Sequence, residues 1–244
     1  VNDGYWGIAV TEGQRYNFQF YLFTEELKNT VVTAALLDCE EQIVVSKNFQ
    51  IERDGSWNHY EGAFTVDTTA NDLRFALLLP HKGKVYIDFV SMFPENTFCG
   101  HKNGLREDVA GMLRDLRPDF VRWPGGCIVE GLTMDNRIKW KETIGDIVKR
   151  PGEYNLWGYR STYGFGYHEF LQFCEDIDAD GLFVCNAGMS CLFRNGDYWE
   201  EENRIDNLIQ DALDAVEYAL GDTTTVYGKR RAENGHAAPV SYTH

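Results

Sequence analysis

Residues 119–131 have the sequence DFVRWPGGCIVEG, in which a short apolar segment is followed by a proline and two glycines and contains an arginine near its end. An ordinary tight turn would explain this sequence. A loop whose backbone must come close to a ligand accounts for it as well, because glycine has no side chain to block the approach. The segments on either side are needed to decide between the two, and they also indicate the fold class.

Helical and strand patterns alternate around this stretch. A helix is predicted over 104–117 and ends at Pro118, and a second helix over 167–177 leads into an apolar strand at 181–188. A third helix is predicted over 203–220. Short apolar strands that alternate with helices are typical of parallel βαβ units. This part of the chain is therefore expected to be a piece of an α/β barrel or of a doubly wound sheet.

Two of the predicted helices carry an apolar stripe at helical spacing. Two or three βα units cannot close a barrel, so these stripes and one strand edge are expected to be exposed. The isolated chain is then expected to aggregate or to need partners. The stripes consist of Leu105, Val109, Met112, Leu113 and Leu116 in the first helix, and of Ile205, Leu208, Ile209, Leu213, Val216 and Leu220 in the third.

The residues up to about 93 follow a period of two instead. In YNFQFYLF (16–23) apolar residues share one face, as in an antiparallel strand with one buried side. The pairs Asp54-Gly55, Asn71-Asp72 and Lys82-Gly83 are read as turns between strands. Short strands at this spacing predict a β-sandwich of jelly-roll type. The other β-rich runs are 30–37, 42–49, 62–66, 73–79 and 84–93.

Composition limits the classes of partner. The 244 residues are 43% hydrophobic and 25% charged, which is ordinary for a globular protein. The formal net charge of −15 argues against nucleic acid, which is bound through Lys and Arg, and fits a neutral ligand such as a sugar better. There is no run of about 20 apolar residues to span a membrane and no signal peptide. The chain starts at Val1 rather than at a methionine, and we expect it to be part of something longer.

The cysteines give no metal or disulfide pattern. No CxxC pair occurs, and the spacing to the six histidines matches no metal motif. Free thiols are expected, with Cys174 and Cys185 as small buried hydrophobes. We therefore predict no metal and no cofactor. The six residues are Cys39, Cys99, Cys127, Cys174, Cys185 and Cys191.

Polar residues follow both predicted strands of the second part. In parallel α/β folds ligands bind beyond the carboxyl ends of the strands, so these residues are candidates for a site. Arg122 could instead pair with a neighbouring carboxylate, and Asn186 could cap the next turn. A long connection to about residue 166, rich in Trp, Gly and Tyr, is typical of a functional loop. The candidates are Arg122, Gly125, Gly126 and Cys127 after the first strand and Asn186, Gly188 and Ser190 after the second.

Other residues of this region also have two interpretations. Trp157 and Tyr159 could line a site or cap the core. We interpret His168 and Glu169 as structural, since a glutamate in the first turn of a helix is favoured by the macrodipole. Glycoside cleavage needs two suitably spaced carboxylates, and none of the loop carboxylates has a sequence context that identifies it as an acid or a nucleophile. These are Glu130, Asp135, Glu142, Asp146 and Glu153.

Several motifs in fixed order resemble the α-L-arabinofuranosidases of glycoside hydrolase family 51. They are NGLREDVAGMLRDLRPDFVRWPGGCIVEG, WKETIGDIVKRPG, LWGYRSTYGFGYHEFLQFCEDI, CNAGMS and QDALDAVEYALGD. The β-rich part, with GYWGIAV, TAALL and VYIDFVSMFP, is similar to the carbohydrate-binding-module-like jelly roll of long members. The resemblance implies a multidomain β plus α/β chain. Its jelly roll (1–94) is expected to begin after the first strand, and a partial (β/α)8 TIM barrel (95–244) is expected to hold about strands two and three.

The resemblance implies a retaining hydrolase of terminal arabinofuranosyl residues on hemicellulose or pectin side chains. The family's acid/base belongs to an Asn-Glu dipeptide, which is missing from this sequence. Both catalytic glutamates are therefore expected beyond residue 244, and the chain by itself is expected to be inactive. The last residues, PVSYTH, do not fit the family pattern.

The resemblance also implies five substrate-binding residues. Arg122 matches a partner of the nucleophile, Gly126 and Cys127 match a loop that approaches arabinose, Trp157 matches a pocket wall, and Asn186 faces the pocket. Smaller members often have Asn in place of Cys127. The partner is then an arabinose-containing polysaccharide or oligosaccharide, with a secreted or periplasmic location favoured by that substrate, and the full-length parent could form oligomers. The alternatives are a different enzyme on the same barrel and a non-catalytic carbohydrate-binding module using Trp6, Trp57 and Tyr60, which could equally be core residues.

Overall fold

The computed structural model describes residues 1–2, 6–27, 30–51, 55–199 and 201–240. The chain divides into two compact units, Val1–Gly111 and Met112–His244. The division falls within helix α1 (Glu107–Asp115), whereas the boundary expected at residue 94 coincides with the end of strand β7 (Tyr86–Pro94). Each unit has its own hydrophobic core and is described by itself.

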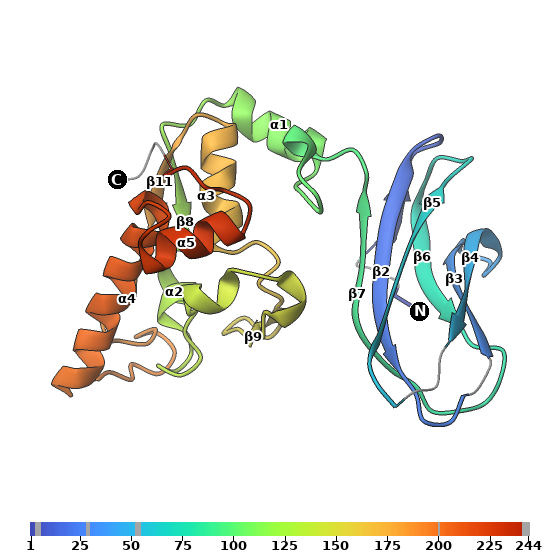
Figure 1. The fold of residues 1–244 in the computed structure, drawn as a ribbon, viewed down its shortest axis with the longest axis horizontal. Coiled ribbons are helices and arrows are strands. Elements are labelled where there is room, and N and C mark those ends of the chain that lie inside the picture. Colours follow the sequence, from blue (N-terminus) through green and yellow to red (C-terminus); the bar gives the residue numbers. More distant parts are fainter. Residues whose placement is uncertain (3–5, 28–29, 52–54, 200, 241–244) are drawn as a thin grey trace. The chain divides into compact units, whose positions relative to one another are not determined.

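The first unit is a sandwich of two antiparallel sheets (Figure 1). One sheet has the order β1-β6-β3-β4 and the other the order β5-β2-β7. A short 3-10 helix, η1 (Phe98–Gly100), follows the sandwich. The strands besides β7 are β1 (Ile8–Val10), β2 (Arg15–Phe23), β3 (Thr30–Leu37), β4 (Ile43–Ile51), β5 (Asn58–Thr65) and β6 (Ala70–Leu78).

Aromatic side chains from both sheets fill the space between them. In β2, Tyr16, Phe18, Phe20 and Leu22 are buried and the residues between them are more exposed, as the alternation predicted. Phe18 stacks on Phe64 with ring centroids 4.3 Å apart. Each fully buried side chain of this kind contributes about 1.5–3 kcal/mol relative to an exposed one. The sandwich is therefore stabilised mainly by its apolar interior.

One predicted turn is wrong. Asn71 and Asp72 lie inside β6, because β1 pairs with the start of this strand and extends the ladder through them. The chain bends at Asp67 and Thr68 instead. Gly7 explains the close pairing, since a Cβ on it would lie 2.4 Å from the Cα of Asp72. Lys82-Gly83 lies in the loop between β6 and β7, as predicted, whereas the Asp54-Gly55 turn involves a residue outside those described.

The second unit contains one parallel strand pair, β8 (Phe120–Trp123) and β11 (Asp180–Phe183), joined through helix α3 (Tyr167–Asp176). This confirms a parallel βαβ unit. Phe120 pairs with Asp180 and Trp123 with Phe183, so the carboxyl ends of both strands lie side by side. The other elements are α2 (Gly126–Glu130), η2 (Trp140–Thr143), η3 (Ile147–Lys149), β9 (Glu153–Tyr154), β10 (Arg160–Ser161), α4 (Glu202–Leu220) and α5 (Val226–Glu233).

The strand predicted over 181–188 is wrong in length, because β11 ends at Phe183. Beyond it the Asn186 side-chain oxygen accepts hydrogen bonds from the backbone N–H groups of Gly188 and Met189, at 2.6 and 3.2 Å. Asparagine competes with strand pairing through such local bonds. The segment after β11 is therefore a turn that carries the side chains expected at its end.

Helix α4 packs on the unit with one face and exposes another. Tyr218 and Ala215 are buried against Trp140 and Tyr167, whose rings lie 5.1 Å apart. Most of the apolar stripe predicted for this helix lies on the other side, and its residues Ile209, Leu213, Val216 and Leu220 are about half exposed, as predicted. In α1, Val109, Met112 and Leu113 are exposed as well, and so is Leu116 directly after the helix. Within the described residues no helix is long and apolar enough to cross a membrane.

Candidate functional site

The residues predicted to form a site gather at the carboxyl ends of β8 and β11. After β8 the chain passes the cis peptide bond Trp123–Pro124 and enters α2 at Gly125, whose φ of 87° lies in the left-handed region that favours glycine. The loop after β11 is tied back to α2 by the side-chain amide of Asn186, which donates to the Val129 carbonyl at 2.9 Å. The two strand ends and their loops thus form one continuous surface.

Arg122 directs its guanidinium along this surface. The side chain is exposed and runs beside Gly125, where an added Cβ would lie 3.1 Å from Nη2 of Arg122. Among the described residues no carboxylate lies within ion-pair distance of Arg122, so the alternative of a structural pair with a neighbour is not what is observed. A fixed cation at a strand end is therefore available to an anion.

Gly126 leaves open space in front of the loop. An added Cβ on Gly126 would have no heavy atom within 4 Å, and its φ is not in the left-handed region. Gly125 differs, since it combines a positive φ with the Arg122 contact. A tight turn therefore explains why a glycine stands at position 125, but it does not explain the glycine at position 126.

Asn186 uses all of its side-chain polar atoms within the protein. Besides the Val129 carbonyl, its amide nitrogen donates to the Met189 carbonyl at 3.0 Å, and its oxygen accepts the two N–H bonds already described. The structure therefore gives Asn186 a turn-capping role, which was one of the two sequence interpretations. Asn186 follows the end of β11, whose partner β8 carries Arg122, because the two strands run parallel.

Trp157 lies in the hairpin between β9 and β10. Its side chain is 51% exposed, and that of Tyr159 is 52% exposed, so neither ring caps the core. The backbone N–H of Trp157 donates to Asn155 Oδ1 at 2.9 Å, and the Tyr154 hydroxyl donates to the Gly158 carbonyl at the same distance. The hairpin thus presents two aromatic rings to solvent.

Most of the loop carboxylates have structural partners. Asp146 accepts the Val148 N–H at the start of η3, Glu153 accepts from Asn136 at 3.2 Å, and Glu142 lies 3.9 Å from Lys139. Glu169 binds Arg150 and the backbone N–H of Gly166, which confirms the structural interpretation. These contacts give no acid and nucleophile pair. His168 is also structural: its Nδ1 lies 2.9 Å from the Tyr218 hydroxyl, and burial lowers the pKa of the imidazole.

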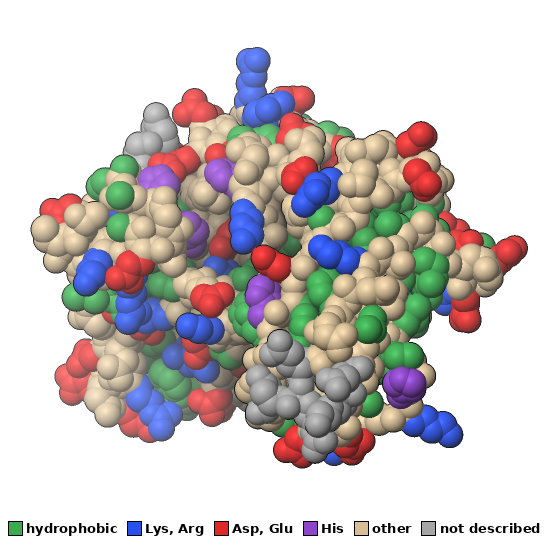
Figure 2. Space-filling model, turned by 45° about the vertical axis from the view of Figure 1, so that its right-hand side comes forward, with side chains coloured by type: hydrophobic (Ala, Val, Ile, Leu, Met, Phe, Trp, Pro, Cys, Tyr) green, Lys and Arg blue, Asp and Glu red, His purple; other side chains and the backbone are tan. Residues whose placement is uncertain are grey.

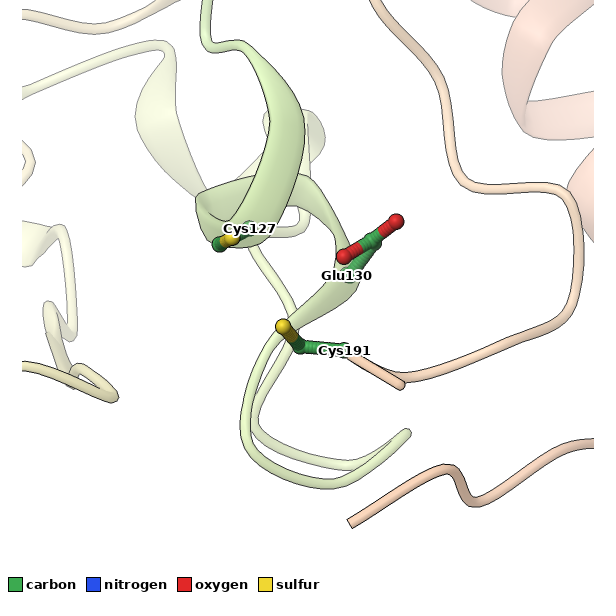
Figure 3. A group of neighbouring side chains, drawn as sticks. All are labelled: Cys127, Glu130 and Cys191. Atoms are coloured by element: carbon green, nitrogen blue, oxygen red, sulfur yellow. The ribbon is translucent and has the colours of Figure 1, made fainter. Parts of the chain in front are cut away.

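A cluster that sequence analysis missed lies beneath the same loops. The ligand atoms of Cys127, Glu130 and Cys191 all lie within 4.8 Å of one another (Figure 3). Cys127 and Glu130 are one helical turn apart on α2, and the Cys191 side chain points toward this helix. Burial and hydrogen bonds to Cys127 and Glu130 raise the pKa of the Cys191 thiol. The i, i+3 spacing of Cys127 and Glu130 is a signal, but Cys191 is too distant in sequence to be assigned to it.

The visible surface has no continuous basic region. Figure 2 shows acidic and basic side chains dispersed over the face that it presents, with hydrophobic side chains between them.

The chain is similar to known α-L-arabinofuranosidases by sequence and by structure. Residues 112–244 match the family model described as alpha-L-arabinofuranosidase 1 domain. An extracellular exo-α-L-arabinofuranosidase of Streptomyces chartreusis is 35% identical over 100% of this chain and 30% of its own length. α-L-Arabinofuranosidase 2 of Arabidopsis thaliana is 33% identical over 98% of this chain and 35% of its own.

A solved structure extends the similarity over both units. The arabinose-bound MgGH51 α-L-arabinofuranosidase superposes with a TM-score of 0.91 at 28% identity, covering 99% of this chain and 40% of that one. The chain therefore spans about a third of the length of the curated relatives named above, with 30% and 35% coverage of them.

Proposed function

From the premise that this chain belongs to the α-L-arabinofuranosidases of glycoside hydrolase family 51, we propose that it forms part of the sugar-binding surface of a retaining enzyme. The complete enzyme removes terminal non-reducing α-L-arabinofuranosyl residues from side chains of hemicellulose or pectin. In this proposal the sandwich is the jelly roll of a long family member. β8 and β11 are strands two and three of its (β/α)8 barrel.

The exposed guanidinium of Arg122 beside the open space at Gly126 is the observation that carries the proposal. Retaining glycosidases use two carboxyl groups about 5–5.5 Å apart, one as nucleophile and one as acid/base. Three of the five loop carboxylates have local contacts and Glu130 lies in the cysteine cluster, and none of these contacts gives an acid and nucleophile pair, so we assign both catalytic roles to glutamates outside residues 1–244. Arg122 then holds the nucleophile in its ionised form through a charge-assisted hydrogen bond.

The other predicted residues would shape the subsite. The backbone at Gly126 and Cys127 gives the furanose room to approach, because no side chain stands over Gly126. The exposed ring of Trp157 offers a flat apolar surface of the kind that packs against a sugar. Asn186 supports this surface by holding the loop after β11 against α2, rather than by contacting a hydroxyl.

The proposal is tested by the hydrolysis of an aryl α-L-arabinofuranoside. The purified chain is compared with a version extended through the parent reading frame, with and without Arg122→Met. We expect activity only in the extended version, and a loss of at least about 100-fold with Arg122→Met, similar to the loss of other electrostatic catalytic contacts. Activity in the chain of 244 residues would mean that a pair among its own loop carboxylates performs the reaction.

Carbohydrate binding by the sandwich is a second candidate. Trp57 and Tyr86 are half exposed, and both rings contact Phe23, at 5.9 and 5.7 Å, so an aromatic platform lies on the outer face of the β5-β2-β7 sheet. Tyr60 is not part of it, because its ring stacks on buried Phe20 at 5.2 Å. Affinity electrophoresis in arabinan and arabinoxylan tests the candidate. Retardation that Trp57→Ala abolishes would support it, whereas unchanged mobility of the parent chain would exclude it.

A further inference from the structure

The cluster of Cys127, Glu130 and Cys191 has the composition of a cation site. Two sulfur atoms and a carboxylate oxygen lie within 4.8 Å of one another. Around a tetrahedral Zn²⁺, with Zn–S near 2.3 Å and Zn–O near 2.1 Å, such atoms stand about 3.5–3.8 Å apart. A small contraction of the three side chains is therefore enough to reach ligand distances.

The surroundings leave a negative group without a basic partner. Glu130 is half buried, and among the described residues no Lys, Arg or His lies within ion-pair distance of its carboxylate. The thiol beside it is buried, with Cys191 only 1% exposed. Burying a carboxylate without a compensating positive charge is costly. A cation at this position would remove that cost.

The backbone already holds the three ligands in place. The Cys191 N–H donates to the Gly131 carbonyl at 3.0 Å, directly after the helix that carries Cys127 and Glu130. The contact between Asn186 and Val129 joins the same two loops a second time. The ligands therefore need little ordering to bind, which favours affinity.

We propose that Cys127, Glu130 and Cys191 bind a thiophilic divalent cation of the Zn²⁺ class through both sulfurs and one carboxylate oxygen. Thiolates select such metals over Mg²⁺ and Ca²⁺, which prefer oxygen ligands. Binding releases the two thiol protons to solvent, so that the site carries thiolates. Three protein ligands leave a fourth position for water. The cation clips the loop after β8, which bears Gly126, to the loop after β11.

Metal binding by the untagged full chain tests this directly. The reduced protein is freed of metal with a chelator, its six thiols are confirmed by titration, and Zn²⁺ binding is measured by competition with a chromophoric chelator. Co²⁺ serves as a spectroscopic probe, since a thiolate-to-cobalt charge-transfer band reports sulfur ligation. We expect about one ion per chain and that band.

Three variants locate the site. Glu130→Gln preserves the shape of the side chain, and Cys191→Ser removes one sulfur. Each variant should weaken Zn²⁺ binding more than about tenfold, because losing a residue that only hydrogen-bonds to a metal ligand already costs about tenfold in affinity. Cys185, which was predicted to be buried, is exposed after β11 instead, so Cys185→Ser is the control and should bind normally. Equal binding by all variants, no binding by the parent chain, or a Cys127–Cys191 disulfide in unreduced protein would overturn the proposal. None of these readouts depends on arabinofuranosidase activity.

Discussion

Arg150 and Glu169 form a bidentate ion pair that fixes the long connection after β8 to the start of α3. Arg150 Nη1 and Nη2 lie 2.9 and 2.7 Å from the two carboxylate oxygens, and the Arg150 side chain is only 4% exposed. The same guanidinium donates to the carbonyls of Gly145 and Tyr163. The connection that carries Trp157 is thus anchored to α3 by this buried ion pair in addition to the apolar contact between Trp140 and Tyr167.

Replacing Arg150 should destabilise the second unit strongly. Arg150→Met leaves Glu169 and two carbonyls without their partner, which we expect to lower the free energy of unfolding by about 3 kcal/mol. Lys149→Met is the matched control, because Lys149 is exposed and lies 4.0 Å from Asp146; its loss should cost less than about 1 kcal/mol. Urea unfolding of both variants checks the difference. Equal losses would mean that the buried pair is not what anchors the loop.

The contacts of Asp214 should make stability depend on pH. Burial opposes its charged form, but hydrogen bonds from Lys141 and Gln210 outweigh this and lower the pKa of Asp214. A lowered folded-state pKa stabilises the fold above the unfolded value near 3.9, and this contribution disappears as the pH falls through the folded value. Asp214→Asn should therefore lower the free energy of unfolding by about 1.5 kcal/mol at pH 7 and change it little near pH 2.

Thermal unfolding of the parent and Asp214→Asn across this pH range measures the effect. Asp206→Asn is the control, since Asp206 is exposed on the same helix. A gap between parent and Asp214→Asn that does not narrow at low pH would contradict the electrostatic explanation.

Asn186 should matter for stability and not only for sugar binding. In Asn186→Asp the amide donor is replaced by a carboxylate that faces the carbonyls of Val129 and Met189. Leaving these two carbonyl acceptors without a donor should lower the free energy of unfolding by about 1–3 kcal/mol. Asn195→Asp makes the same change at an exposed position of the following loop and should be near neutral. If a melting experiment shows both variants to be as stable as the parent, the turn-capping role of Asn186 is wrong.

Gly125 and Gly126 should respond differently to alanine. Gly125→Ala forces a side chain into a φ of 87° beside Arg122 and should destabilise by about 1 kcal/mol or more. Gly126→Ala meets open space and should leave the melting temperature nearly unchanged. In an active extended version it should instead raise KM, because the new methyl group stands where the furanose approaches. Unchanged kinetics for Gly126→Ala would argue against that placement of the sugar.

The exposed stripe of α4 should drive self-association of the chain. Leu213 and Val216 are 57% and 54% exposed and line an apolar groove with Ile205 and Ile209. Leu213→Lys with Val216→Lys should reduce the apparent mass in light scattering. Asn203→Lys with Asn207→Lys adds the same charge at exposed polar positions of the helix and should not reduce it. A monodisperse parent chain would refute the expectation of aggregation.

Local patterns predicted the elements well and their ends less well. The period of two in β2 and the helical period in α3 and α4 are properties of neighbouring residues, so they could be read directly. The Asn71-Asp72 turn failed because pairing with β1 outweighs local turn preference. β11 was predicted too long because its ladder ends where its partner β8 ends, at Trp123 before Pro124, and the periodicity of one strand does not record where its partner stops.

The site shows the same division. The sequence placed Arg122 and Asn186 at the ends of two parallel strands, because strand ends follow from pattern and their adjacency follows from βαβ topology. It left open whether Arg122 has a partner and whether Asn186 caps a turn, since both depend on which atoms come within bonding distance.

The amino-acid sequence by itself determined most of the strands and helices, because their periodicity depends on residues close together in the chain. It also determined the family motifs and their order, because these are read directly along the chain. Tertiary structure alone decided that Cys191 meets Cys127 and Glu130 and that Arg150 meets Glu169. The physical reason is range: hydrogen bonds and ligand contacts act over a few ångströms in space, and sequence separation does not record which loops the packing brings that close.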